Sequence, residues 1–173
     1  MTTPDIAVAI ECPAWTEALP DAEERCRRLA AIALGAAPID HDGPVELSIV
    51  LADDDTVRGL NRDWRGKDQP TNVLSFASLD DEGAPRVAGA PLLLGDVILA
   101  WETTAAEAAA QGKPLADHFT HLVLHGVLHL LGFDHEEAEE AEEMEALETT
   151  LLAALGIADP HGHPDDEESD KGR

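Results

Sequence analysis

The sequence predicts an α+β fold: a small mixed β-sheet packed with helices, with a metal site on a central helix and the turn that follows it. Two observations predict the fold class. Segments of alternating apolar and polar residues are interspersed with segments of helical periodicity, and their order is that of an α+β domain. Apolar residues make up 44% of the 173 residues and aromatic residues only 3%, so the core must be built mostly from Leu, Val, Ile and Ala.

The expected strands are short apolar or alternating runs over residues 5–11, 45–51, 72–77 and 92–99. The expected helices cover about 22–34, 56–64, 102–111, 115–131 and 136–155. Asp21 is a candidate cap for the first helix and Gly35 its stop, because glycine adopts the left-handed conformation that ends many helices. Acids that begin at Asp53 favour the positive end of the second helix. Gly112 and Pro114 separate the third helix from the fourth.

The chain is predicted to form a single domain over residues 1–157, followed by a disordered acidic tail over 158–173. It has no run of about eighteen apolar residues and no basic and apolar leader, so neither a membrane span nor secretion is expected. Cys12 and Cys26 lack CxxC spacing, which fits a reducing compartment. The expected location is therefore the cytoplasm.

The strongest chemical signal is the segment from His125 to His135, which predicts a catalytic zinc site. His125 and His129 are four residues apart on a predicted helix, so their imidazoles lie on one face, offset by about 40°. Gly132 can end the helix, and the chain can then fold back to bring His135 to the same point. Three neutral nitrogen ligands leave a fourth position open, as in catalytic rather than structural zinc sites, and predict one Zn²⁺ per chain.

The residues around these histidines limit the chemistry. The H-x3-H-x2-G-x2-H spacing is that of the metzincin proteases, but those proteases carry a glutamate base directly after the first histidine, where this chain has Gly126. A different reaction is therefore expected. His121, one turn before His125, is a candidate to support the ligands or contact a substrate, or else a packing residue, and His118 is expected to be exposed. Asp134 can orient a ligand imidazole or share a proton with a metal-bound water, or simply form the turn.

The charge distribution leaves a nucleic-acid partner open. A net charge of −25 argues against one. Four of the eleven basic residues nevertheless lie close together in the sequence, namely Arg58, Arg62, Arg65 and Lys67. Because salt screens charges within about 8 Å, binding of phosphate depends on the local potential more than on the net charge.

Two motifs of this chain occur together in one known family. The pattern HGxLHLxGxDH is met in full by residues 125–135, and a second, approximately NxxYRxKDxPTxVLSF, by residues 61–76, with Trp64 in place of tyrosine. Residues 94–97 are similar to an LGDI segment and residues 141–148 to a C-terminal helix of the same family. Over roughly residues 45–157 the chain thus resembles the YbeY family of bacterial rRNA maturation factors, metal-dependent endoribonucleases that act on single strands.

The resemblance implies roles for residues of the second motif. The family's arginine falls on Arg65, which would pair with phosphate oxygens and serve catalysis. An ion pair of Arg65 with Asp63 or Asp68 is the structural alternative. Lys67 is a candidate contact with the RNA backbone. Ser75 is a candidate lining residue of the cleft, although a polar strand face turned to water explains it equally well.

The implied function is that of a zinc-dependent, single-strand-specific endoribonuclease in rRNA maturation, particularly at the 3′ end of the small-subunit rRNA, and in ribosome quality control. Its metal ligands would be His125, His129 and His135, with His125 also counted as catalytic. Its expected partners are single-stranded RNA and the small ribosomal subunit, with no DNA and no membrane. Two alternatives remain open: a metal-dependent hydrolase of other substrates such as peptides, and a non-catalytic ribosome assembly factor whose zinc is structural.

Overall fold

The computed structural model describes residues 4–36, 44–77, 92–131 and 138–157. The chain divides into two compact units, Met1–Gly132 and Phe133–Arg173. In chain order the elements of the first unit are β1 (Asp5–Ile10), α1 (Ala14–Ala18), α2 (Ala22–Ala36), β2 (Val45–Ala52), α3 (Asp54–Arg65), β3 (Val73–Ala77), β4 (Leu92–Ala100), α4 (Trp101–Gln111) and α5 (Leu115–Leu130). The described part of the second unit contains α6 (Ala138–Ala154), which is followed by Gly156 at a positive φ of 81°.

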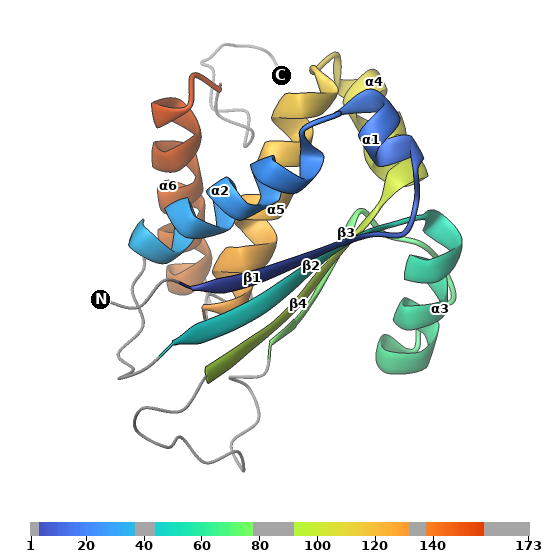
Figure 1. Cartoon of the computed structure of the whole chain (residues 1–173), viewed down its shortest axis with the longest axis horizontal. Helices are drawn as coiled ribbons and strands as arrows, with labels where there is room; N and C mark the ends of the chain where they lie inside the picture. Colours follow the sequence, from blue (N-terminus) through green and yellow to red (C-terminus); the bar gives the residue numbers. More distant parts are fainter. Residues whose placement is uncertain (1–3, 37–43, 78–91, 132–137, 158–173) are drawn as a thin grey trace. The chain divides into compact units, whose positions relative to one another are not determined.

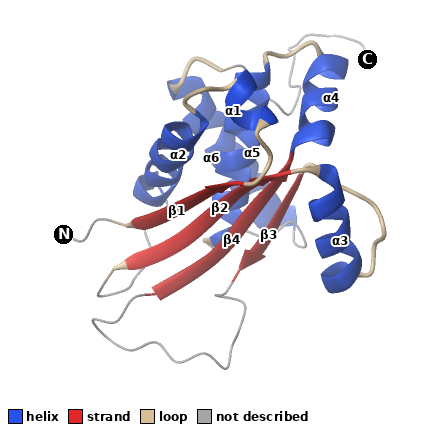
Figure 2. Cartoon of the chain, turned by 45° about the vertical axis from the view of Figure 1, so that its right-hand side comes forward, coloured by secondary structure: helices blue, strands red, loops and turns tan. Residues whose placement is uncertain are grey.

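The four strands form one mixed sheet in the order β1-β2-β4-β3. β1, β2 and β4 are parallel, whereas β3 runs antiparallel to β4 and forms one edge of the sheet. Figure 2 shows the sheet with its helices. This mixed sheet and the helices confirm the α+β prediction.

The helices α2 and α5 cover one face of the sheet (Figure 1). Val97 of β4 points to this face, because it lies against Gly126 of α5, and its neighbour in the pairing is Ile49 of β2. The aliphatic core that was expected is present here, and it is completed by Trp15 and Phe119, both fully buried, with ring centroids 5.4 Å apart.

The opposite face of the sheet carries α3 (Figure 1). Val57 of α3 is fully buried in a cluster with four strand residues, Ala52, Leu74, Ile98 and Ala100. These strand residues alternate along the chain with those that face α5, and successive side chains of a strand point to opposite faces. The sheet therefore separates α3 from α5.

The first turns of α3 and α4 cap one another. Asp53 is the N-cap of α3, and its carboxylate accepts a hydrogen bond from the Thr56 N–H at 2.9 Å. The carboxylate of Asp54 accepts two hydrogen bonds from Thr103, from the backbone N–H and from Oγ1, both at 2.9 Å. In return, the Asp54 N–H donates to the Glu102 carboxylate at 2.8 Å. These contacts fix the start of α3 at one end of the sheet.

The boundaries of most elements agree closely with those expected. Two differences occur in the N-terminal part, where α1 was not predicted and α2 continues through Gly35 to Ala36. Gly35 is not among the glycines with a positive φ, so it does not end the helix. The single domain over residues 1–157 stays a prediction, and the predicted tail over 158–173 lies outside the described residues. None of the described helices is long and apolar enough to cross a membrane.

Candidate metal centre

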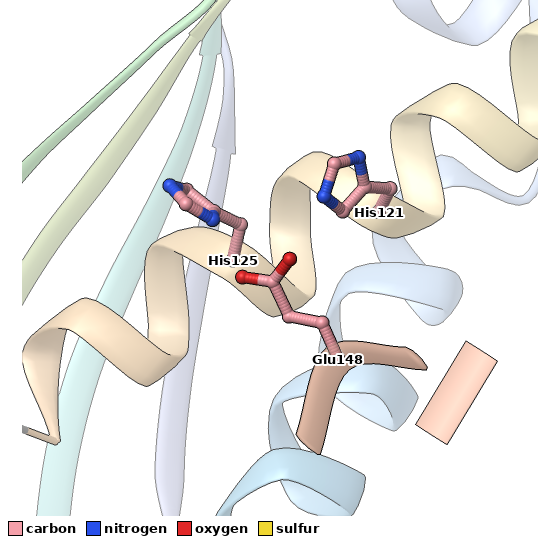
Figure 3. Close-up of side chains that lie close together, drawn as sticks. All are labelled: His121, His125 and Glu148. Carbon is pink, nitrogen blue, oxygen red and sulfur yellow. The ribbon is translucent and has the colours of Figure 1, made fainter. Parts of the chain in front are cut away.

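One side of α5 carries a row of histidines, His118, His121, His125 and His129. Their spacing of three or four residues places them in a narrow stripe of the helix surface. The ring centroids of His121 and His125 are 5.9 Å apart, and those of His125 and His129 are 4.8 Å apart. Figure 3 shows His121 and His125 on successive turns of α5; Glu148, drawn with them, belongs to α6 of the second unit.

The histidine row fits a metal ion. A ring nitrogen of His121 and one of His125 lie within 4.8 Å of each other, and both side chains are partly exposed. Neutral imidazoles are ligands that zinc and other transition metals accept. His121, expected to support the ligands, to contact a substrate or to pack, lies beside His125 in the structure. His135 and Asp134 lie outside the described residues, so the ligand set of His125, His129 and His135 stays a prediction.

His118, at the start of the row, is a buried anchor rather than an exposed residue. It is 4% exposed, and its Nε2 lies 2.9 Å from the Glu107 carboxylate of α4. The same carboxylate oxygen accepts a hydrogen bond from Nδ2 of Asn72, just before β3, at 3.0 Å. The expectation of an exposed His118 was therefore wrong, because a carboxylate of the preceding helix, α4, satisfies the ring inside the fold.

Gly126 allows α5 to lie directly on the sheet. A Cβ at this position would come within 2.5 Å of Cγ1 of Val97 and 3.4 Å of Oγ of Ser75. The hydroxyl of Ser75 donates a hydrogen bond to the Gly126 carbonyl at 3.3 Å, so Ser75 contacts the turn of α5 that carries His125. A glutamate base cannot occupy position 126 unless Val97 moves. Close packing against Val97 thus excludes a glutamate at position 126, and without that base the site lacks the proton acceptor of the metzincin reaction.

The loop after α3 is held in place by hydrogen bonds from side chains of α3. Asn61 is 2% exposed, and its Nδ2 donates to the Gln69 carbonyl at 2.8 Å. Arg58 donates two hydrogen bonds to the Asp68 carboxylate, at 2.8 and 3.2 Å. This contact with Arg58 holds the pKa of Asp68 below its ordinary value. Gly66 ends α3 with a φ of 73°, in the left-handed conformation.

Arg65 and Lys67 are exposed beside this loop. The predicted structural alternative, an ion pair of Arg65 with Asp63 or Asp68, does not occur, because both acids pair with other arginines. Within the described ranges, neither Arg65 nor Lys67 has a side-chain hydrogen bond or ion pair. Arg65 ends α3 and so belongs to the opposite face of the sheet from the histidine row. The edge strand β3 contacts both helices and lies between them.

A groove on the face of α3, which we call the α3 groove, was not expected from the sequence. It has a volume of about 560 Å³. Its walls include Leu60 and Trp64 of α3 and Phe76 and Ile98 of the sheet, and Glu11 and Asp96 supply carboxylates. A signal for it exists in the sequence. Val57, Leu60 and Trp64 follow the spacing of an apolar helix face, which therefore continues beyond the buried Val57 to an exposed tryptophan.

The fold and the site together define a class: an α+β domain with a mixed sheet and a helix whose histidines suit a metal ion. Residues 12–156 match the family described as Endoribonuclease YbeY. The chain belongs to the YbeY family, as its two motifs predicted. The histidine row and the family together indicate a metal-binding hydrolase.

Two relatives and one solved structure illustrate the similarity. The Endoribonuclease YbeY of Paramagnetospirillum magneticum is 80% identical over 160 residues, which cover 92% of this chain and 97% of that protein. The Endoribonuclease YbeY of Rhodospirillum rubrum is 55% identical over 149 residues, covering 83% of this chain and 74% of that protein. A solution structure of a Thermotoga maritima protein is 22% identical, with a TM-score of 0.50 over 97% of this chain and 99% of that one. The last comparison concerns the fold alone.

Proposed function

We propose that this chain is a zinc-dependent endoribonuclease that cleaves single-stranded RNA in the cytoplasm. Its substrate would be rRNA, particularly the 3′ end of the small-subunit rRNA, and its partner the small ribosomal subunit, in maturation and quality control. The name endoribonuclease, carried by relatives that are 80% and 55% identical, supports the activity. The structural observation that carries the proposal is the pair of ring nitrogens of His121 and His125, within 4.8 Å on a partly exposed helix side.

His125 and His129 of α5, joined by His135, would hold the metal ion. Bound zinc lowers the pKa of a water molecule to about 7 and so makes a nucleophile available at neutral pH. Other residues of the chain keep the histidine row in place. His118 is anchored to α4 through Glu107, and Ser75 bonds the turn that carries His125. The histidine row is therefore fixed to α4 at His118 and to β3 at the turn that carries His125.

Arg65 would bind phosphate oxygens. A guanidinium is always charged and offers parallel donors that match a phosphate, whereas Lys67 would act as a simpler charge along the backbone. Because the sheet separates α3 from α5, we propose that the RNA strand crosses the edge strand β3, with Arg65 on one side and the histidines on the other. A flexible single strand can follow this path, while a duplex resists bending over tens of base pairs.

Peptide hydrolysis of the metzincin type is less well supported. It needs a glutamate base at position 126, where a Cβ alone would come within 2.5 Å of Val97. The structure thus offers that reaction neither the residue nor the space for it.

Metal content and RNA cleavage of two variants test the proposal. The wild type is expected to bind one zinc per chain and to cleave a single strand but not its duplex. His125→Ala should lose the metal and more than about 100-fold in cleavage rate, because a ligand is gone. Arg65→Ala should keep the metal and bind the RNA about 10- to 100-fold more weakly, with slower cleavage when RNA is limiting, because a charged contact with the phosphate backbone on the α3 side is gone. His161→Ala, outside the described residues, is the matched control and should change neither quantity.

Two results would contradict the proposal. Cleavage at the wild-type rate by both His125→Ala and Arg65→Ala would mean that the activity belongs to a contaminant. Loss of metal without loss of cleavage in His125→Ala would make the metal structural and favour a different chemistry.

A further inference from the structure

The α3 groove is a cavity that the metal chemistry does not use. It lies on the face of the sheet that α3 covers only in part, whereas the histidine row belongs to α5 on the other face. Its walls are mainly apolar, from Leu60, Phe76 and Ile98. A cavity of about 560 Å³ with apolar walls and a few polar groups has the character of a ligand site.

Trp64 is the unusual residue of this groove. Its side chain is 73% exposed, although tryptophan is normally buried to a large extent. Its ring stands edge-to-face with that of Phe76, with centroids 6.2 Å apart and planes at 64°. Trp64 is thus held against the groove wall while most of its surface remains available. An exposed and supported aromatic ring is a surface on which a flat, aromatic ligand can stack.

The charges around the groove indicate which part of a nucleic acid fits there. Asp96 and Glu11 line the groove, and ionised carboxylates repel phosphate but accept hydrogen bonds from the N–H groups of bases. Ser48 donates a hydrogen bond to one oxygen of Asp96, which fixes the orientation of this carboxylate. Arg65 directly follows Trp64, is exposed and has no ion pair within the described ranges. A nucleotide whose base lies inside the groove and whose phosphate lies outside it would place N–H donors near the two carboxylates and the negative charge near Arg65.

We propose that the α3 groove binds one unstacked base of single-stranded RNA, which stacks on Trp64 while its phosphate lies toward Arg65. This inference rests on the proposed function and adds a base-binding subsite to it, on the opposite face of the sheet from the metal centre. It also supplies a further reason for single-strand specificity. A base in a duplex is already stacked and paired, and would have to be removed from the helix before it could reach Trp64.

The test compares binding of a labelled single-stranded RNA by the wild type, Trp64→Ala, Trp64→Phe and Leu93→Ala, all as the full chain loaded with zinc. Trp64→Ala should bind about 5- to 150-fold more weakly, the range expected for loss of one stacked base. Trp64→Phe keeps an aromatic face and should bind within about threefold of the wild type. Leu93→Ala removes another large exposed side chain, 52% exposed, and should bind like the wild type.

An abasic version of the same strand identifies the ligand group. Without bases, the wild type and Trp64→Ala should bind equally, because only the backbone contacts remain. Equal binding of the two proteins to the normal strand would overturn the proposal. A difference that persists on the abasic strand would also overturn it, because the occupant of the groove would then not be a base.

Tryptophan fluorescence gives a second measurement that does not need Trp64→Ala to fold. Of the three tryptophans, Trp15 is fully buried and Trp101 is half-buried, so Trp64 is the most exposed emitter. RNA should quench the wild type but not Trp64→Phe, and equal quenching of both would overturn the proposal. If the wild type itself neither binds nor cleaves RNA, the proposed function fails. If it cleaves RNA while Trp64→Ala binds normally, only the subsite fails.

Discussion

The two faces of the sheet in the first unit are built for different tasks. The face under α5 is closed, since Leu47, Ile49 and Val97 are at most 2% exposed there. The face under α3 is sealed only around Val57 and leaves Trp64 73% exposed at the α3 groove. A tightly packed face can hold a row of histidines in fixed positions. An incompletely covered face offers a surface to a ligand, so positioning and access are divided between the two faces.

The edge strand β3 joins these faces, because its side chains alternate between them. Ser75 bonds the carbonyl of Gly126 on the α5 side. Its neighbour Phe76 meets the ring of Trp64 on the α3 side. A change in the position of β3 must therefore reach both the histidine row and the α3 groove, whereas a change within α5 or α3 should reach only one.

Gly95→Ala is expected to have the largest effect, because it disturbs the pairing of β3 with β4 and thus both faces. Gly95 has a φ of 135°, and a Cβ there would come within 2.1 Å of the Phe76 carbonyl oxygen and 3.0 Å of Cδ2 of Leu130. It lies at a bulge, where the register with β2 shifts. The free energy of unfolding, measured with denaturant, should fall by more than about 3 kcal/mol.

Gly112→Ala is the matched control for this prediction. Gly112 also has a positive φ, of 66°, but a Cβ there would meet nothing within 4 Å. Gly112→Ala should lower the free energy of unfolding by only about 1 kcal/mol, which is the cost of a left-handed backbone conformation for a residue with a Cβ. Equal losses in Gly95→Ala and Gly112→Ala would mean that β3 is not held by a close backbone contact at Gly95.

Gly126→Ala is expected to disturb the face under α5 alone. The new methyl group meets Cγ1 of Val97 at 2.5 Å, and this overpacking should cost about 1–3 kcal/mol of unfolding free energy and weaken metal binding. The emission of Trp64 should stay unchanged, because the α3 groove lies on the other face.

The double variant Gly126→Ala with Val97→Ala tests the cause of that loss. If the two side chains collide, the double variant should lose less stability than the sum of the single variants, with a coupling of about 0.5–3 kcal/mol. Additive losses would show that the contact with Val97 is not what requires glycine at this position.

Local signals account for the parts of the fold that were predicted correctly. The strand over 45–51 and the helix over 115–131 follow from periodicity, and the start of α3 follows from the acids at Asp53. The five-residue helix α1 was missed because it follows Pro13 without a side-chain cap and is too short to show a period. Gly35 shows the opposite error, since glycine permits a helix to end but does not force it to.

The arrangement of the candidate site needed information that is not local. His118 is buried because of Glu107 on another helix, and a single residue in a sequence does not reveal such a partner. The motif that contains Arg65 runs directly into β3, which suggests that it lies beside the histidines. The packing of Val57 against Ile98 instead places α3 on the other face of the sheet. Such a choice of face depends on contacts between distant residues, and the sequence pattern is the same for either face.

Asp53→Ala is expected to have the smallest effect and to act on the face of α3 alone. Removal of this N-cap should cost about 1 kcal/mol of unfolding free energy at neutral pH, and Asp53→Asn, which keeps a capping oxygen, should cost less. Metal binding on α5 should be unchanged in both variants.

The hydrogen bond from the Thr56 N–H lowers the pKa of Asp53 from its ordinary value of 3.8. The carboxylate cap therefore stabilises the fold above the unfolded-state pKa, and this contribution is lost as the pH falls through the lower folded-state pKa. The difference in stability between wild type and Asp53→Ala should accordingly shrink as the pH is lowered toward about 3. A difference that is constant from neutral to acidic pH would mean that the charged carboxylate does not provide the cap, and a loss of metal in Asp53→Ala would mean that the two faces are not independent.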